Sequence, residues 1–159
     1  MRRRVITALL NLVILCVSPL LAFPNQKSTK TKKPTDWSVA MVDSTMKRYP
    51  TTKDLGTWGY AKALYLYGQY LVYKRTHEPG YLQYIKDWID SHVDANGVVT
   101  NTNAQGVTSQ IKYDSLDSMM PGNLLLLLYQ ETKDPKYKLA ADRIRQRFDT
   151  YPRTKDGGF

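Results

Sequence analysis

The sequence is poor in the side chains that metal, redox and nucleophile sites require. It contains one cysteine, Cys16, and two histidines, His77 and His92. Without a second cysteine no internal disulfide can form, and a zinc site of cysteine and histidine has too few ligands. No serine lies in a nucleophile-elbow sequence, and no glycine-rich phosphate loop is present. We therefore expect neither a metal centre nor a cofactor.

A long hydrophobic span is lacking as well. Residues 2–4 are arginines, residues 5–15 are mostly apolar, and small and turn-forming residues follow up to Ala22. This order is that of a secretory signal peptide, and the run is much shorter than the roughly 20 residues that a bilayer requires. We predict a signal peptide over residues 1–22 and a periplasmic or secreted protein, without stable membrane insertion after cleavage. A lipid anchor at Cys16 is the alternative, but the preceding residues are not the small ones that such signals use.

Residues 23–35 are predicted to form a disordered linker before the domain at 36–159. Residues 24–34 contain lysines, threonines and two prolines but no aromatic residue. The formal net charge of the chain is +9, and loss of the three leader arginines leaves +6. A basic excess suits nucleic acid or an acidic glycan. Because an exported protein meets glycans more often, we expect no nucleic-acid partner.

The pattern beyond the linker is helical almost throughout. An internal repeat organises it: a shift of 56 residues superposes Thr76 on Thr132, Pro79 on Pro135 and Tyr81 on Tyr137. The second and fourth helices are the more apolar, as inner helices are, while the third and fifth carry exposed charges. These features predict an all-α fold of alternating inner and outer helices. The expected helices are 36–49, 58–75, 79–93, 116–132 and 135–151.

Loop lengths predict where a functional site lies. Turns within each hairpin are short, whereas the connections at 50–57, at 94–114 and from Pro152 onward are long. Successive helices alternate in direction, so all long connections emerge on one face, where sites usually lie. Trp58 and Tyr60 follow the first of these connections. Their rings suit stacking on a sugar, although aromatic residues at this place can equally fasten the hairpins together.

Two carboxylates precede or begin the fourth helix. Asp114 and Asp117 are three residues apart and would share one helical face if the helix began early enough. The alternative is that they cap this helix and interact with its dipole.

The C-terminal residues form a glycine-containing segment on the same predicted face. Arg153 and Lys155 supply two cations, and Gly157 and Gly158 follow them. Such a segment suits a carboxylate ligand, or it is an unstructured tail.

From Trp37 to Phe159 the chain resembles the unsaturated rhamnogalacturonyl hydrolases of glycoside hydrolase family 105. The most specific parts are Trp58-Gly59-Tyr60, Leu116-Asp117 to Gly122, Leu127-Leu128-Tyr129 to Thr132, Tyr137-Lys138, Pro152-Arg153-Thr154 and Gly157-Gly158-Phe159. The resemblance implies a six-hairpin α/α toroid that hydrates the unsaturated terminal uronic acid of a pectin-derived oligosaccharide. It also implies that Asp117 is the first active-site aspartate. The remaining candidates, as substrate-binding residues, are Trp58, Tyr60, Asp114, Arg153, Gly157 and Gly158.

The sequence departs from the family pattern at its end. In the family, the glycine-glycine-phenylalanine leads into a tryptophan-histidine pair and then into a tryptophan-leucine-aspartate-glycine segment that holds the principal acid. The sequence stops at Phe159, before both. We therefore expect only about the first five helices of the toroid, in a fragment that is inactive alone.

Two other functions remain open at this point. An exported helical-repeat scaffold would also stack hairpins, but the 56-residue repeat exceeds the roughly 34 residues of tetratricopeptide arrays. A non-catalytic glycan-binding protein would share the aromatic residues, and it would bind saturated and unsaturated sugars alike.

The predicted export signal can be tested directly. In exported protein, mass spectrometry should show that about the first 22 residues are absent, because the signal is cleaved beside small residues. A soluble cytoplasmic product that keeps Met1 would contradict the prediction.

Overall fold

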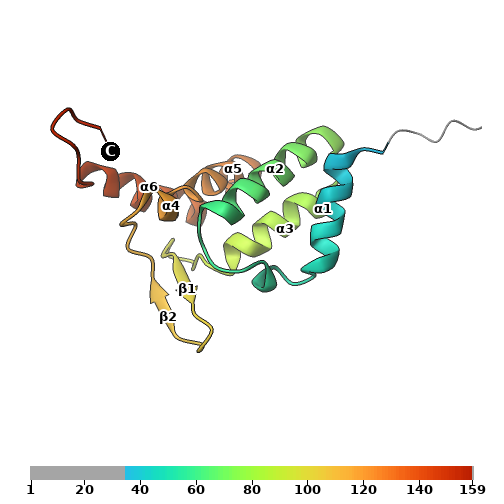
Figure 1. Ribbon diagram of the computed structural model, residues 1–159, viewed down its shortest axis with the longest axis horizontal. Helices are drawn as coiled ribbons and strands as arrows, with labels where there is room; N and C mark the ends of the chain where they lie inside the picture. The colour runs from blue at the N-terminus through green and yellow to red at the C-terminus, as the bar shows by residue number, and fades with distance from the viewer. Residues whose placement is uncertain (1–34, 159) are drawn as a thin grey trace, which may run out of the picture. The chain divides into compact units, whose positions relative to one another are not determined.

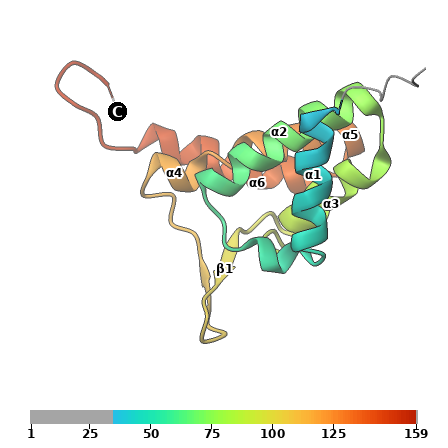
Figure 2. The ribbon, with the colours of Figure 1, turned by 45° about the vertical axis from the view of Figure 1, so that its right-hand side comes forward.

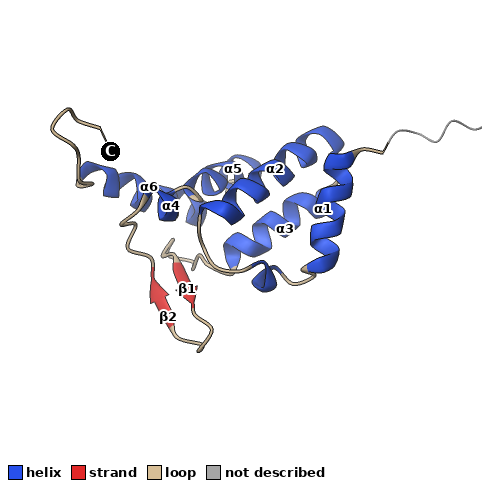
Figure 3. Ribbon diagram, in the orientation of Figure 1, coloured by secondary structure: helices blue, strands red, loops and turns tan. Residues whose placement is uncertain are grey.

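The computed structural model describes residues 35–158; the predicted signal peptide and nearly all of the predicted linker lie outside this range. Figures 1 and 3 show a helical arrangement with one small β-hairpin. No helix in the described range is long and apolar enough to cross a membrane. In chain order the elements are α1 (Trp37–Arg48), the 3-10 helix η1 (Thr52–Leu55), α2 (Tyr60–Thr76), α3 (Pro79–Asp90), β1 (Thr100–Thr102), β2 (Thr108–Gln110), α4 (Leu116–Met119), α5 (Gly122–Thr132) and α6 (Pro135–Asp149).

All five predicted helices are present, and the fourth is divided into α4 and α5. The break falls at Pro121, which has no amide hydrogen to donate to the carbonyl group four residues earlier. Gly122 then begins α5 close to α6, since a Cβ atom there would lie 3.2 Å from Cδ1 of Ile144. The proline and the glycine thus let the chain change course before the long apolar helix.

The β-hairpin was not predicted from the sequence, which indicated only a long loop at 94–114. Thr100 pairs with Gln110 and Thr102 with Thr108 in antiparallel register. Threonine favours extended backbone because its branched Cβ fits a pleated surface. Gly106, with φ of 79°, lies in the turn between the strands.

The 56-residue repeat is confirmed at the level of single hydrogen bonds. Thr76 Oγ1 donates to the carbonyl oxygen of Val72 at 2.9 Å, and Thr132 Oγ1 donates to that of Leu128 at 2.7 Å. Each hydroxyl also accepts from the amide two residues later, at 3.4 Å and 3.2 Å. The same side chain therefore ends α2 and α5 in the same way.

The turns after α2 and α5 are also alike. His77 and Lys133 adopt left-handed backbone with φ of 57° and 61°. Glu78 and Asp134 then cap α3 and α6, because their carboxylates accept from the amides two residues later. Pro79 and Pro135 occupy the first helical positions, where a missing amide costs nothing.

A tyrosine of each outer helix binds an aspartate of the preceding outer helix. The Tyr81 hydroxyl donates to Asp43 on α1 at 2.8 Å, and that of Tyr137 donates to Asp90 on α3 at 2.7 Å. Both rings are buried, and Tyr137 is fully so. These equivalent bonds join successive repeats and set the spacing between their outer helices.

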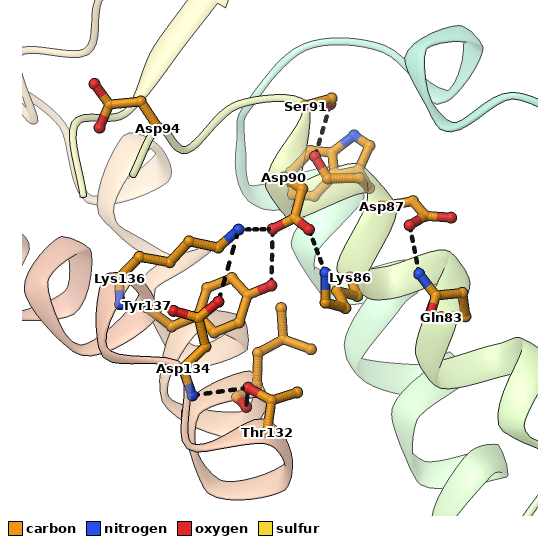
Figure 4. A network of polar contacts seen from close by, with 12 residues as sticks. Gln83, Lys86, Asp87, Asp90, Ser91, Asp94, Thr132, Asp134, Lys136 and Tyr137 are labelled. Atoms are coloured by element: carbon orange, nitrogen blue, oxygen red, sulfur yellow. Dashed lines mark hydrogen bonds and ion pairs between the residues drawn. The ribbon is translucent and has the colours of Figure 1, made fainter. Parts of the chain in front are cut away.

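Asp90 is the centre of a polar network between α3 and α6 (Figure 4). Its carboxylate pairs with Lys86 on its own helix and with Lys136 on α6, the latter at 2.8 Å. Partial burial opposes ionisation, but the hydrogen bonds from Lys136, Lys86 and Tyr137 outweigh it and lower the pKa of Asp90. Burial and the bond to Asp90 together raise the pKa of Tyr137 far above its usual value. The tyrosine is therefore a permanent donor and the aspartate a permanent acceptor at neutral pH.

Helix α2 packs against α1, α3, α4 and α5. Its Gln69 is the only buried polar side chain in the described range, and it accepts from Tyr65 at 2.9 Å and donates to the Tyr81 carbonyl at 2.9 Å. Because its hydrogen bonds offset the cost of removing the amide from water, Gln69 can join α2 to α3 inside the core. The exposed large apolar residues of α2 lie at spacings of four, three and four, which places them on one face of the helix: Tyr60, Leu64, Tyr67 and Leu71.

Trp58 fastens the start of α2 to three other segments. Its ring stacks on Trp88 of α3 with centroids 5.7 Å apart and an interplanar angle of 4°, and His92 lies edge-on to both rings. Its amide donates to Asn101 Oδ1 at 2.8 Å, and its Nε1 donates to the Ser118 carbonyl oxygen at 2.7 Å. Trp58 is 6% exposed, so the cluster is part of the core.

Gly97 provides a sensitive test of how the turn after α3 packs on α6. Its φ is 70°, and a Cβ atom would lie 2.7 Å from the amide nitrogen of Ala140 and 2.8 Å from Cβ of Leu139. We expect Gly97→Ala to lower the free energy of unfolding by about 2–4 kcal/mol, from left-handed strain and overpacking together. Gly106→Ala is the matched control, because φ is 79° there but nothing lies within 4 Å of the added atom. It should cost only about 1 kcal/mol in urea denaturation, and equal losses for both variants would contradict the packing.

Trp58 can be tested in the same assay. Trp58→Phe removes buried ring atoms and leaves the Ser118 carbonyl without its donor, so we expect a loss of about 2–4 kcal/mol. Tyr60→Phe changes a residue that is 48% exposed and should stay within about 0.5 kcal/mol. A mild effect of Trp58→Phe, comparable with that of Tyr60→Phe, would mean that the indole does not hold the segments together.

Candidate functional site

One end of the helical hairpins gathers the long connections, as the sequence predicted. The bonds from Trp58 join the connection before α2 to β1 and to α4. The Tyr151 hydroxyl donates to the Asp114 carbonyl oxygen at 3.5 Å, which brings the segment after α6 to the same place. The two-residue turns at 77–78 and 133–134 lie at the other end of the hairpins (Figures 1 and 2). Three connections that are distant in sequence therefore form one rim.

Asp117 lies on this rim, in the first turn of α4. Ser115 caps this helix: its backbone is extended and its Oγ accepts from the Ser118 amide at 3.3 Å. The Asp117 carboxylate is exposed, and among residues 35–158 it has no hydrogen bond or ion pair of its own. Because Ser115 does the capping, this carboxylate is available to a ligand.

Asp114 does not share a helical face with Asp117, which corrects the arrangement considered from their spacing. Helix α4 begins only at Leu116, and Ser115, which lies between the two aspartates, has extended backbone, so Asp114 lies outside the helix. Neither aspartate is the cap. The Asp114 side chain is exposed, while its carbonyl group binds Tyr151.

The two candidate aromatic residues differ in exposure. Trp58 is buried against Trp88 and His92, which is the arrangement expected of a residue that fastens hairpins together. Tyr60 is 48% exposed at the first position of α2, so its ring is open to a sugar. Burial lowers the pKa of His92, although the carbonyl groups of Thr100 and Gly56 oppose the shift. His92 is therefore neutral at pH 7 and belongs to the core cluster.

Arg153, Gly157 and Gly158 form a closed turn of their own. Arg153 Nη1 donates to the Gly157 carbonyl oxygen at 2.9 Å, and the Thr154 amide donates to that of Gly158 at 2.9 Å. Gly157 has φ of 86°, a backbone that favours glycine. This segment extends away from α4 in both views (Figures 1 and 2), so the structure does not place it beside Asp117. Its role in substrate binding stays a prediction.

Sequence reasoning missed two features of the rim. The first is Asn101, whose side chain accepts from the Trp58 amide; an asparagine in a long polar loop carries no signal for that role. The second is an apolar groove of about 440 Å³ between α4, α5 and α6, lined in part by Leu116, the neighbour of Asp117. The sequence indicated apolar helices there but not a hollow.

The rim carries an exposed carboxyl group in the first turn of α4 and an exposed aromatic ring at the start of α2. Carboxylate oxygens accept from sugar hydroxyls, and a carboxyl group can transfer a proton. In the described range, no three His, Cys, Asp or Glu side chains are grouped so as to hold a metal ion. The arrangement suits recognition of a carbohydrate and acid–base chemistry on it.

Comparison with known proteins identifies the family. Residues 37–159 match the model of Glycosyl Hydrolase Family 88. The fold is similar to that of a solved glycoside hydrolase of family 105 from C. acetobutylicum ATCC 824, with a TM-score of 0.64 and 30% sequence identity over 76% of this chain. The chain spans 31% of that protein's length. The resemblance seen in the sequence is thus confirmed, and the hairpins α2–α3 and α5–α6 are repeats of a six-hairpin glycosidase fold. The chain belongs to Glycosyl Hydrolase Family 88.

Proposed function

We propose that the protein hydrates the unsaturated uronic acid at the end of pectin-derived rhamnogalacturonan oligosaccharides. A proton is added to the vinyl ether carbon, water adds next to the ring oxygen, and the opened product releases the neighbouring sugar. Membership of a glycoside hydrolase family and the likeness to a family 105 enzyme support this reaction class. The reaction needs a positioned carboxyl group and no metal.

The observation that carries the proposal is the state of Asp117. It is exposed and lies on the rim where three connections meet, and Ser115 rather than Asp117 caps α4. In the proposed site Asp117 contacts the substrate and orients the chemistry. The proton donor implied by the resemblance belongs to a tryptophan-leucine-aspartate-glycine segment, which residues 1–159 do not contain.

The other rim residues would bind the sugar. The Tyr60 ring offers a face for stacking, and the Asp114 carboxylate offers acceptors for hydroxyl groups. The basic excess of the chain favours a substrate that carries carboxylates. We further propose that the protein acts after export, in the periplasm or outside the cell, as the predicted signal peptide indicates.

The family membership disfavours a helical-repeat scaffold. A non-catalytic glycan-binding protein is distinguished by its ligands: it would bind saturated and unsaturated oligosaccharides equally and would leave the ultraviolet absorbance of the double bond unchanged.

Asp117→Asn tests the proposal in a protein that contains both this chain and the acid-bearing tryptophan-leucine-aspartate-glycine segment that the resemblance implies. Since Ser115 caps α4, the fold and melting temperature should stay unchanged, while kcat/KM falls roughly a hundredfold or more. The assay follows the loss of ultraviolet absorbance of the unsaturated uronyl group. Asp87→Asn is the control, because Asp87 is an exposed carboxylate on the outer helix α3. Activity of the Asp117 variant within about threefold of the parent, only about 0.7 kcal/mol of barrier, would remove Asp117 from the site.

A further inference from the structure

An open cavity of about 710 Å³ lies between the end of the β-hairpin and helix α6. Lys112 and Tyr113, which follow β2, line one side, and Arg143 and Arg147 of α6 line the other. Among the described residues, three cations thus line this cavity and no acidic side chain does. Three positive charges around one hollow repel each other, and an anion bound between them would offset this repulsion.

The other basic residues of α6 are compensated. Lys138 pairs with Asp142 at 2.6 Å, Arg145 with Asp149 at 2.9 Å, and Lys136 with Asp90 at 2.8 Å. These ion pairs neutralise most of the positive charge of α6, so those cations need no ligand.

The cations of the cavity are different. Arg143 donates to the Asn96 carbonyl oxygen, and Arg147 donates to the carbonyl and hydroxyl oxygens of Thr150. These acceptors are neutral, and within residues 35–158 neither arginine nor Lys112 has a carboxylate at ion-pair distance. Arg147 also lies over the Tyr151 ring, 5.4 Å from its centroid. Helix α6 therefore carries carboxylate-paired cations outside the cavity and cations with only neutral partners along it.

Tyr113 adds an independent observation. It is 7% exposed, and its hydroxyl is the one buried side-chain polar atom in the described range without a hydrogen-bond partner. An unmet buried hydroxyl costs about 1–3 kcal/mol, and such groups commonly signal a missing ligand or water. Burial raises the pKa of Tyr113 to about 12, although the charge of Arg143 opposes the shift. The group is therefore protonated and can only be a donor towards an anion.

We propose that this cavity binds an acidic group, a carboxylate or a sulfate, of an anionic oligosaccharide. Lys112, Arg143 and Arg147 supply the charge and the Tyr113 hydroxyl a hydrogen bond. The choice of a saccharide rests on the proposed function. Tyr113 directly precedes Asp114 on the rim. A uronic-acid chain whose end lies at Asp117 could therefore bring the carboxylate of a later sugar to this cavity.

The test is calorimetric titration of this protein with a saturated oligogalacturonate and with its neutral methyl ester. The acidic form should bind and the ester should not. The double variant Arg143→Gln/Arg147→Gln should weaken binding by roughly tenfold or more, because charge-assisted hydrogen bonds are lost. Lys138→Gln is the matched control, since it removes a cation of the same helix that is paired outside the cavity.

Tyr113→Phe separates a ligand-binding role from a packing role. The hydroxyl has no partner in the free protein, so its removal should leave the melting temperature equal or higher while it weakens binding of the acidic oligosaccharide severalfold. Equal binding of acid and ester, or unchanged affinity in the double variant, would overturn the proposal. Binding of inorganic sulfate alone as tightly as the acidic oligosaccharide, at the same ionic strength, would overturn its saccharide part. A saturated ligand is not turned over, so these outcomes are independent of the double-bond assay.

Discussion

The contacts of Trp58 are the interaction on which the arrangement of the site depends. One residue joins the start of α2, the β-hairpin, α3 and α4 through two hydrogen bonds and a stacked ring. Because its Nε1 holds the carbonyl group of Ser118, the residue next to Asp117, the position of the candidate catalytic carboxylate follows from core packing. An exposed carboxylate on a four-residue helix would otherwise be poorly fixed, and catalysis requires close positioning.

The helical hairpins that surround the Trp58 cluster are shaped by the internal repeat. Equivalent threonines, left-handed turn residues and capping carboxylates shape both hairpins, and the pairs Tyr81–Asp43 and Tyr137–Asp90 join one outer helix to the next. Each such bond sits between a buried ring and a partly exposed carboxylate. The short turns are thus specified residue by residue at one end, which leaves the long connections at the other end free to differ and to carry function.

Charged residues also differ between the outer helices and the part of the molecule that the long connections form. On α3 and α6, Lys86, Lys136, Lys138 and Arg145 pair with acids of their own or the neighbouring helix. Among the described residues, Asp117 at the rim has no partner, and Lys112, Arg143 and Arg147, which line the cavity beside Tyr113, have no carboxylate partner. Pairing on the outer helices serves the fold. Charges without a charged partner support the proposed binding of an acidic carbohydrate, and a carbohydrate ligand agrees with the family.

The sequence by itself determined the helices, the hairpin repeat, the face on which the long connections meet and the family, because these depend on local periodicity, turn residues and matched motifs. It could not decide whether Trp58 faces a ligand or the core, whether Asp114 and Asp117 share a helix, or that residues 100–110 form a β-hairpin. Those outcomes depend on contacts between residues far apart in the chain, such as Trp58 with Ser118 and Tyr151 with Asp114. The cavity beside Tyr113 was likewise beyond sequence reasoning, because its lining comes from two segments that only the tertiary fold brings together.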